Sequence, residues 1–149
     1  MIRPLTLQDE AAWRELWRKY LVFYKAEQPE AVYAANWARL HDPAEPMWGA
    51  LAVQDGQAVG LVNWVYQRTF WSTSDVCYLQ DLYVAEAGRG QGHGRALIDY
   101  CTARATEDGA HRVQWMTHET NTTAQALYDK VAQRSGFIQY RKAVVTITG

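Results

Sequence analysis

Hydrophobic residues recur along this chain with the two spacings that are typical of helices and of strands. Near the N-terminus, Trp13, Leu16, Trp17 and Tyr20 have helical spacing and share one face of a predicted helix. Capping residues and glycine or proline stops complete the pattern. They predict a first helix capped by Thr6 or Asp9 and ending near residue 24, and further helices over about 28–41, 92–107 and 122–134.

Runs of β-branched and aromatic residues predict strands at 2–5, 48–53, 58–66, 76–84 and 112–116, and the last strands at 137–147. The Asp55-Gly56 pair between two of these runs is a strong hairpin signal. The order of the elements predicts a mixed central sheet flanked by helices, an α/β or α+β fold. We find no repeat or linker in the 149 residues, so we expect a single domain over residues 1–149.

The composition argues against several classes of protein. The formal net charge is −1 without a basic stripe, which disfavours binding to nucleic acid or to a membrane surface. We find no apolar run long enough for a signal peptide or a membrane span. Cys77 and Cys101 lack the spacing of a metal site, so we expect two buried thiols, no metal and a cytoplasmic location.

Seven Trp and nine Tyr make the chain rich in aromatic residues. They can build a core and a subunit interface, which makes a homodimer compatible with the sequence, or line an apolar substrate pocket. The composition leaves both uses open.

Four glycines, at positions 88, 90, 92 and 94, alternate with other residues where a predicted strand gives way to a helix. Backbone N–H groups in such a turn, at the start of a helix, favour an anion and especially a phosphate. Arg89 and Arg95 add positive charge. The spacing differs from both GxxxxGK[ST] and GxGxxG, which disfavours a nucleotide P-loop and a dinucleotide turn. A loop without a ligand remains an alternative.

Three ordered motifs resemble the GNAT acetyltransferase superfamily. Arg89-x-x-Gly92-x-Gly94 resembles its Arg/Gln-x-x-Gly-x-Gly/Ala signature, between segments 79–84 and 96–98 that resemble its fourth strand and following helix. Segment 121–128 resembles its Asn-x-x-Ala-x-x-Leu-Tyr helix, and 135–137 its Gly-Phe strand entry. The resemblance implies a single-domain GNAT fold with an N-terminal helix pair and a C-terminal β-α-β-α-β order.

The resemblance also implies acetyl-CoA as co-substrate. Its diphosphate would lie on the glycine turn, and its pantetheine arm would pair with the preceding strand. The cofactor-binding residues implied are Leu82, Tyr83, Val84, Arg89, Gly90, Gln91, Gly92, His93, Gly94, Arg95 and Asn121. Asn121 is equally expected to cap the helix that follows it.

Tyr128 matches the family's tyrosine beside the thioester sulfur, although its spacing alone would indicate a core residue. A tyrosine of pKa about 10 is a weaker acid than a thiol of about 8.5, so we expect it to donate a hydrogen bond to the sulfur. Polyamine-acetylating relatives have Glu where this chain has Gln80, which cannot take a proton. The remaining candidates for the base, each also explicable as a structural or solvated polar residue, are Glu27, Asp81, His118 and Glu119.

The acceptor site has four candidate residues. Tyr24, Glu27, Trp71 and Gln80 are candidate substrate-binding residues, with packing as the alternative for both aromatics. The resemblance implies an N-acetyltransferase that acts on a primary amine of a small molecule by direct attack in a ternary complex. A protein lysine or N-terminal acceptor, and a non-catalytic acetyl-CoA-binding module, remain alternatives.

Overall fold

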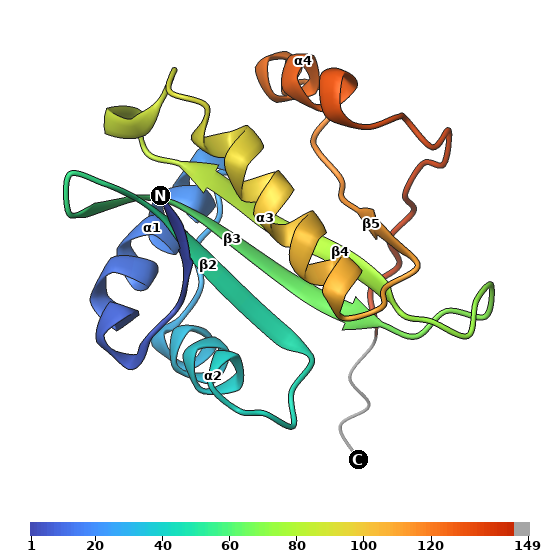
Figure 1. Cartoon of the computed structure of the whole chain (residues 1–149), viewed down its shortest axis with the longest axis horizontal. Helices are drawn as coiled ribbons and strands as arrows, with labels where there is room; N and C mark the ends of the chain where they lie inside the picture. The colour runs from blue at the N-terminus through green and yellow to red at the C-terminus, as the bar shows by residue number, and fades with distance from the viewer. Residues whose placement is uncertain (145–149) are drawn as a thin grey trace. The chain divides into compact units, whose positions relative to one another are not determined.

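A five-stranded sheet organises the larger part of the molecule (Figure 1). The structure is a computed structural model that describes residues 1–144. The chain divides into two compact units, Met1–Met116 and Thr117–Gly149, and the sheet belongs to the first.

The strands follow the order β1-β2-β3-β4-β5 across the sheet. The first four are antiparallel neighbours, and β5 is parallel to β4. Their bounds are β1 Ile2–Pro4, β2 Met47–Gln54, β3 Gln57–Gln67, β4 Val76–Val84 and β5 Arg112–Gln114. Asp55 and Gly56, with φ of 51° and 76°, form the tight β2–β3 turn, which confirms the predicted hairpin.

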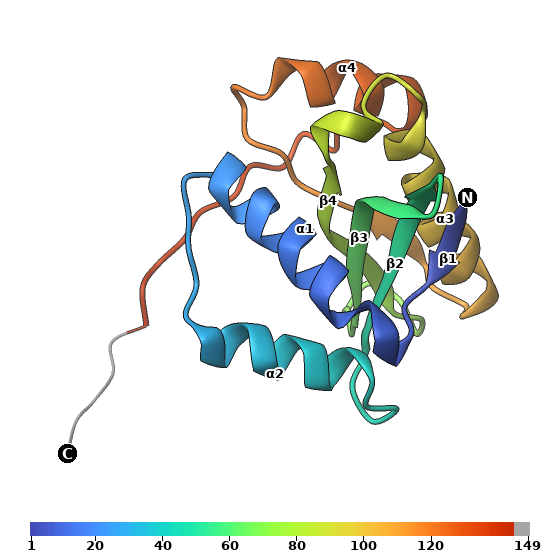
Figure 2. The same cartoon turned by 90° about the vertical axis from the view of Figure 1, so that its left-hand side faces the viewer.

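Helices cover both faces of this sheet, as Figure 2 shows. The helices of the first unit are α1 Glu10–Phe23, α2 Glu30–Leu40 and α3 His93–Glu107, with short 3₁₀ turns at Leu7–Asp9 and Glu86–Gly88. Trp13 on α1 hydrogen bonds to Asn63 of β3, whereas a Cβ added to Gly60 of β3 would lie 3.2 Å from Leu97 of α3. Because Asn63 and Gly60 point to opposite faces of β3, α1 and α3 lie on opposite sides of the sheet.

The tryptophans of the N-terminal helices form the core under α1. Trp13, Trp17 and Trp37 are each less than a tenth exposed, and the rings of Trp13 and Trp17 stack with centroids 5.6 Å apart. They pack with Leu16, Leu21, Leu51, Leu61 and Ala85. Core packing therefore accounts for much of the aromatic content on this side of the sheet.

The second unit contains α4, Thr122–Val131. The strand prediction over 137–147 is wrong for residues 137–144, which, like the rest of the described range 132–144, contain no helix or strand. A β-rich segment becomes a strand only where a neighbouring strand supplies hydrogen-bond partners, and its own pattern cannot guarantee one. Residues 145–147 of that prediction lie outside the described residues. Within the described chain, no helix is long and apolar enough to span a membrane.

Candidate active site

The glycine turn connects β4 to α3 through a backbone that requires glycine. Gly90 and Gly92 have φ of +76° and +78°, and a Cβ on either would meet no described atom within 4 Å. Glycine is needed there for its conformation rather than for space. At Gly88 the need is steric, because a Cβ would lie 2.8 Å from Cβ of Val59.

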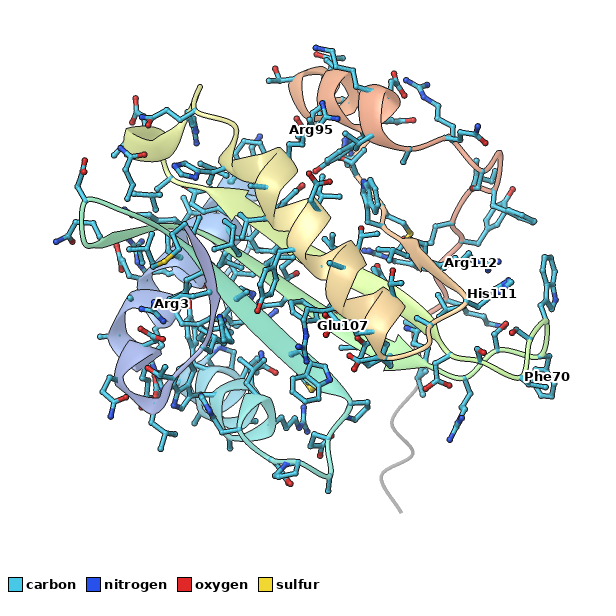
Figure 3. The ribbon with its side chains drawn as sticks, viewed as in Figure 1. Arg3, Phe70, Arg95, Glu107, His111 and Arg112 are labelled. Atoms are coloured by element: carbon cyan, nitrogen blue, oxygen red, sulfur yellow. The ribbon has the colours of Figure 1, made fainter. Side chains whose placement is uncertain are left out.

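Helix α3 begins directly after this turn, with Gly92 as its N-cap. Its first turn contains His93, Gly94, Arg95 and Ala96, so its free N–H groups and positive dipole end are accompanied by basic or neutral residues. Arg95 is marked in that turn in Figure 3. This environment suits a diphosphate.

Side chains hold the turn in place on two sides. The His93 ring Nε2 lies 2.8 Å from Oε1 of Gln54 at the end of β2, and Arg89 Nε donates to the Val84 carbonyl at 3.3 Å. Gln91 lies exposed between Gly90 and Gly92. The structure thus brings the predicted phosphate-binding residues together on one continuous turn.

One edge of β4 is open beside the turn. Strand β5 pairs only with residues 76–78, so within residues 1–116 the segment 79–84 has a strand partner, β3, on one side only. This segment includes Leu82, Tyr83 and Val84. An open edge offers N–H and C=O groups to an extended ligand that adds to the sheet like a strand.

A β-bulge at Gln80 changes which side chains of β4 face α1. Asp81 lies opposite Asn63, but Leu79 lies opposite Trp64, so Gln80 is an extra residue between the two pairs. Trp64 faces α3, where its ring is 6.3 Å from that of Tyr100, and Asn63 faces α1. Leu79 and Asp81, although two positions apart, therefore lie on opposite faces, and Asp81 points to α1.

Asp81 receives hydrogen bonds from neutral donors on two elements. Its Oδ2 accepts from Trp17 Nε1 at 3.2 Å and from Asn63 Nδ2 at 3.1 Å, and the Tyr20 hydroxyl also bonds to this carboxyl. Burial raises the pKa of Asp81, and the three hydrogen bonds offset only part of that rise. Burial likewise raises the pKa of Tyr20 well above its ordinary value.

Sequence reasoning did not identify Trp17, Tyr20 or Asn63 as site residues. Trp17 and Tyr20 follow the apolar spacing of a helix, which hides their polar atoms. Asn63 carried a usable signal, since it is the single amide in the apolar stretch 58–65. A buried amide in a strand needs polar partners, and those partners mark the site.

The predicted acceptor residues are placed at different points of the first unit. Tyr24 caps the end of α1, and its ring lies 5.1 Å from that of Tyr20. It therefore lies beside the Asp81 group, which we define as Asp81 with its donors Trp17, Tyr20 and Asn63. Glu27 is exposed between α1 and α2, and Gln80 is exposed at the bulge. Trp71 follows Phe70, which Figure 3 labels, in the β3–β4 loop, at the end of β4 opposite the glycine turn.

The second unit holds the remaining predicted residues on α4 and its cap. Asn121 Oδ1 accepts from the Ala124 N–H at 3.3 Å, which confirms its capping role. Gln125 Nε2 donates to the carbonyls of His118 and Glu119, fixing the segment before the cap. Tyr128 is half-buried on α4. The roles of Asn121 and Tyr128 toward acetyl-CoA stay predictions.

The cysteines and acidic residues form no metal site among the described residues, since no three His, Cys, Asp or Glu side chains are grouped suitably. Cys77 and Cys101 are free and fully buried, with Sγ atoms 3.7 Å apart. This confirms the prediction of two buried thiols.

Comparison with known proteins identifies the class. Residues 10–132 match the Acetyltransferase (GNAT) family, and the chain belongs to that family. It is 38% identical over 144 residues to the D-amino-acid N-acetyltransferase HPA3 of Saccharomyces cerevisiae, covering 95% of this chain and 89% of the relative. It is 26% identical to the uncharacterized N-acetyltransferase YhfO of Bacillus subtilis, covering 93% and 94% of the two chains.

The fold agrees with that assignment. The aminoglycoside acetyltransferase AAC(6')-Iy, solved with the bisubstrate analogue CoA-S-monomethyl-acetylneamine, superimposes with a TM-score of 0.83 at 21% identity, covering 97% of this chain and 98% of that one. The likeness at this identity concerns the fold. The chain is thus an acetyl-transferring enzyme of the GNAT family, whose members use acetyl-CoA.

Proposed function

We propose that this enzyme transfers the acetyl group of acetyl-CoA to a primary amine of a small molecule, by direct attack in a ternary complex. The observation that carries the proposal is the glycine turn, where Gly90 and Gly92 adopt positive φ directly before the free N–H groups of the first turn of α3. The diphosphate of CoA would accept hydrogen bonds from N–H groups of residues 90–95, with Arg89 and Arg95 adding charge.

The open edge of β4 supports a place for the pantetheine arm. Backbone groups of Leu82 and Val84 would pair with its amides, which would direct the thioester toward the bulge at Gln80. A backbone N–H of this segment would stabilise the oxyanion as the carbonyl carbon becomes tetrahedral. Asn121 would hold the arm, and Tyr128 would donate a hydrogen bond to the sulfur.

The reaction forms one bond and breaks another at the acetyl carbon. The lone pair of the amine nitrogen forms the C–N bond, the C–S bond breaks with its electron pair on sulfur, and the nitrogen loses one proton. A thiolate is a better leaving group when a hydrogen bond offsets its charge, and that is the contribution we assign to Tyr128.

Two observations favour a small-molecule acceptor. The curated relative at 38% identity is named a D-amino-acid N-acetyltransferase. In addition, the Asp81 carboxyl and the Tyr20 and Tyr24 rings form a polar and aromatic group that suits a single amine. Protein lysine or N-terminal amines are the competing acceptor class.

An acceptor panel tests the proposal. The purified chain is incubated with acetyl-CoA and one of D-phenylalanine, L-phenylalanine, the aminoglycoside neamine or a lysine-containing peptide, and free CoA and acetylated product are quantified. We expect at least one small amine to react at least about tenfold faster than the peptide, equivalent to about 1.4 kcal/mol. The matched control is D-phenyllactate, which has a hydroxyl in place of the amine. A preference for the peptide would contradict the proposal.

A further inference from the structure

We propose that Asp81 takes the proton from the attacking amine, and that Trp17, Tyr20 and Asn63 position its carboxylate. The inference rests on the proposed function. It starts from the bulge, because Gln80 cannot accept a proton and the extra residue turns the next side chain, Asp81, onto the α1 face.

The carboxylate is held from both α1 and β3. Trp13 Nε1 donates to Asn63 Oδ1 at 3.0 Å, which fixes the amide so that its nitrogen faces Asp81 at 3.1 Å. Trp17 and Tyr20 approach from α1. A group held on two rigid elements keeps the orientation that proton transfer demands.

The Asp81 carboxyl is hydrogen-bonded but has no cationic partner within residues 1–144. Its donors are an indole, an amide and a phenol, and none of the ion pairs among the described residues involves it. The titratable neighbours on this face are Tyr20 and Tyr24 of α1, Tyr33 of α2, and Tyr78 and Tyr83 of β4. The nearby Arg18 of α1 pairs with Glu15. A carboxylate whose hydrogen-bond partners are all neutral can accept the one proton that a neutral amine loses as it attacks.

The proton balance is complete within the ternary complex. As the C–N bond forms, the nitrogen gains positive charge and becomes more acidic than a free ammonium. One N–H bond then breaks, its electron pair stays on nitrogen, and the proton moves to a carboxyl oxygen of Asp81. Asp81 is half-buried as a residue. The inference requires a substrate nitrogen to reach its carboxyl, and the proton to leave to water after turnover.

The test compares pH profiles of kcat/KM, with D-phenylalanine as the probe acceptor. Removing the Tyr20 hydroxyl by Tyr20→Phe takes away a hydrogen bond that favours the charged carboxylate, so the pKa of Asp81 rises. We expect the acidic limb of the profile to move up by about half to one pH unit. Tyr33→Phe is the matched control, since the Tyr33 ring packs edge-on against Trp17 without being a donor to Asp81, and its limb should not move.

Two further variants keep the test decisive. Asp81→Asn preserves the shape and should lower kcat at least about 100-fold while the Kd for CoA stays within about twofold. If Tyr20→Phe does not fold, Trp17→Phe removes another donor and should shift the limb in the same direction. The inference would be overturned if the acidic limb of the kcat/KM profile lay at the same pH in the wild type and in the donor variant. It would also be overturned if Asp81→Asn kept a kcat within about threefold of the wild type.

Failure of the proposed function is recognised separately. If no acceptor reacts, ¹³C NMR of the labelled Asp carboxyls still reports the Asp81 titration in wild type and Tyr20→Phe. A Tyr20-dependent Asp81 titration without turnover would reject the acceptor chemistry and with it the base role. Turnover without any effect at Asp81 would reject this inference alone.

Discussion

Arg3 and Asp9 form the most buried ion pair of the first unit. The guanidinium donates to both carboxyl oxygens of Asp9, at 2.7 and 2.9 Å, and the Thr6 N–H donates at 2.8 Å. These contacts hold the pKa of Asp9 well below its ordinary value. The stabilisation is therefore present above the unfolded pKa of about 3.9 and is lost as pH falls through the folded pKa.

Asp9→Asn should accordingly lower the free energy of unfolding by about 2 kcal/mol at pH 7. The difference between variant and wild type should shrink as pH falls below about 4, because the unfolded wild type then binds a proton at Asp9 that the folded wild type does not bind, which lowers wild-type stability. Urea denaturation at pH 7 and pH 3 measures both differences. An equal difference at the two pH values would show that the ion pair is not its source.

Tyr128→Phe tests the residue that the resemblance places beside the sulfur. Its hydroxyl contributes only as negative charge develops on the leaving thiolate, so we expect kcat to fall at least about tenfold while the Kd for acetyl-CoA stays within about twofold. Stopped-flow kinetics under conditions where chemistry limits the rate measure the first, and calorimetry the second. If kcat stayed within twofold, Tyr128 would be assigned to packing on α4.

At the level of elements, the geometry at the start of α3 predicts how a substitution there changes the affinity for CoA. Gly92→Val places a β-branched residue at φ +78°, which costs about 1 to 2 kcal/mol of backbone strain and displaces the N–H groups of the turn. We expect CoA affinity to fall at least about tenfold. Gly109→Val is the matched control, because Gly109 has φ +77° at the other end of the same helix and also has open space around it.

Isothermal titration of CoA into both variants measures this prediction. Both should fold, as judged by circular dichroism, and only Gly92→Val should lose affinity. Equal affinities in the two variants would place the diphosphate elsewhere.

The elements also show what could be predicted from the sequence. Helices α1 to α4 and the β2–β3 hairpin follow from local signals, namely periodicity, caps and the Asp55-Gly56 pair. The bulge at Gln80 could not be predicted, because residues 76–84 read as one uninterrupted strand and the extra residue exists only relative to β3. The strand prediction for residues 137–144 was wrong for a related reason, because strand formation depends on a partner far away in the sequence.

The candidate site likewise has one part that could be predicted from the sequence and one part that could not. The glycine turn was predictable because its chemistry lies in consecutive residues, from Arg89 to Arg95. The Asp81 group was not, because it joins residues 17, 20, 63 and 81 through the packing of α1 on β3 and β4. Asp81 stood among several candidate bases in the sequence, and the contacts of this group distinguish it.

At the scale of the whole molecule, an acetyltransferase must turn over acetyl-CoA with an amine and not only bind it. The most direct measurement incubates the wild-type chain with acetyl-CoA and a pool of primary amines, and quantifies free CoA and acetylated amine over time. We expect both products to appear in equal amounts, at a rate well above that of hydrolysis without amine, and Gly92→Val to slow the formation of both at limiting acetyl-CoA. CoA release at the amine-free rate, with acetyl-CoA bound and intact, would contradict the proposed function.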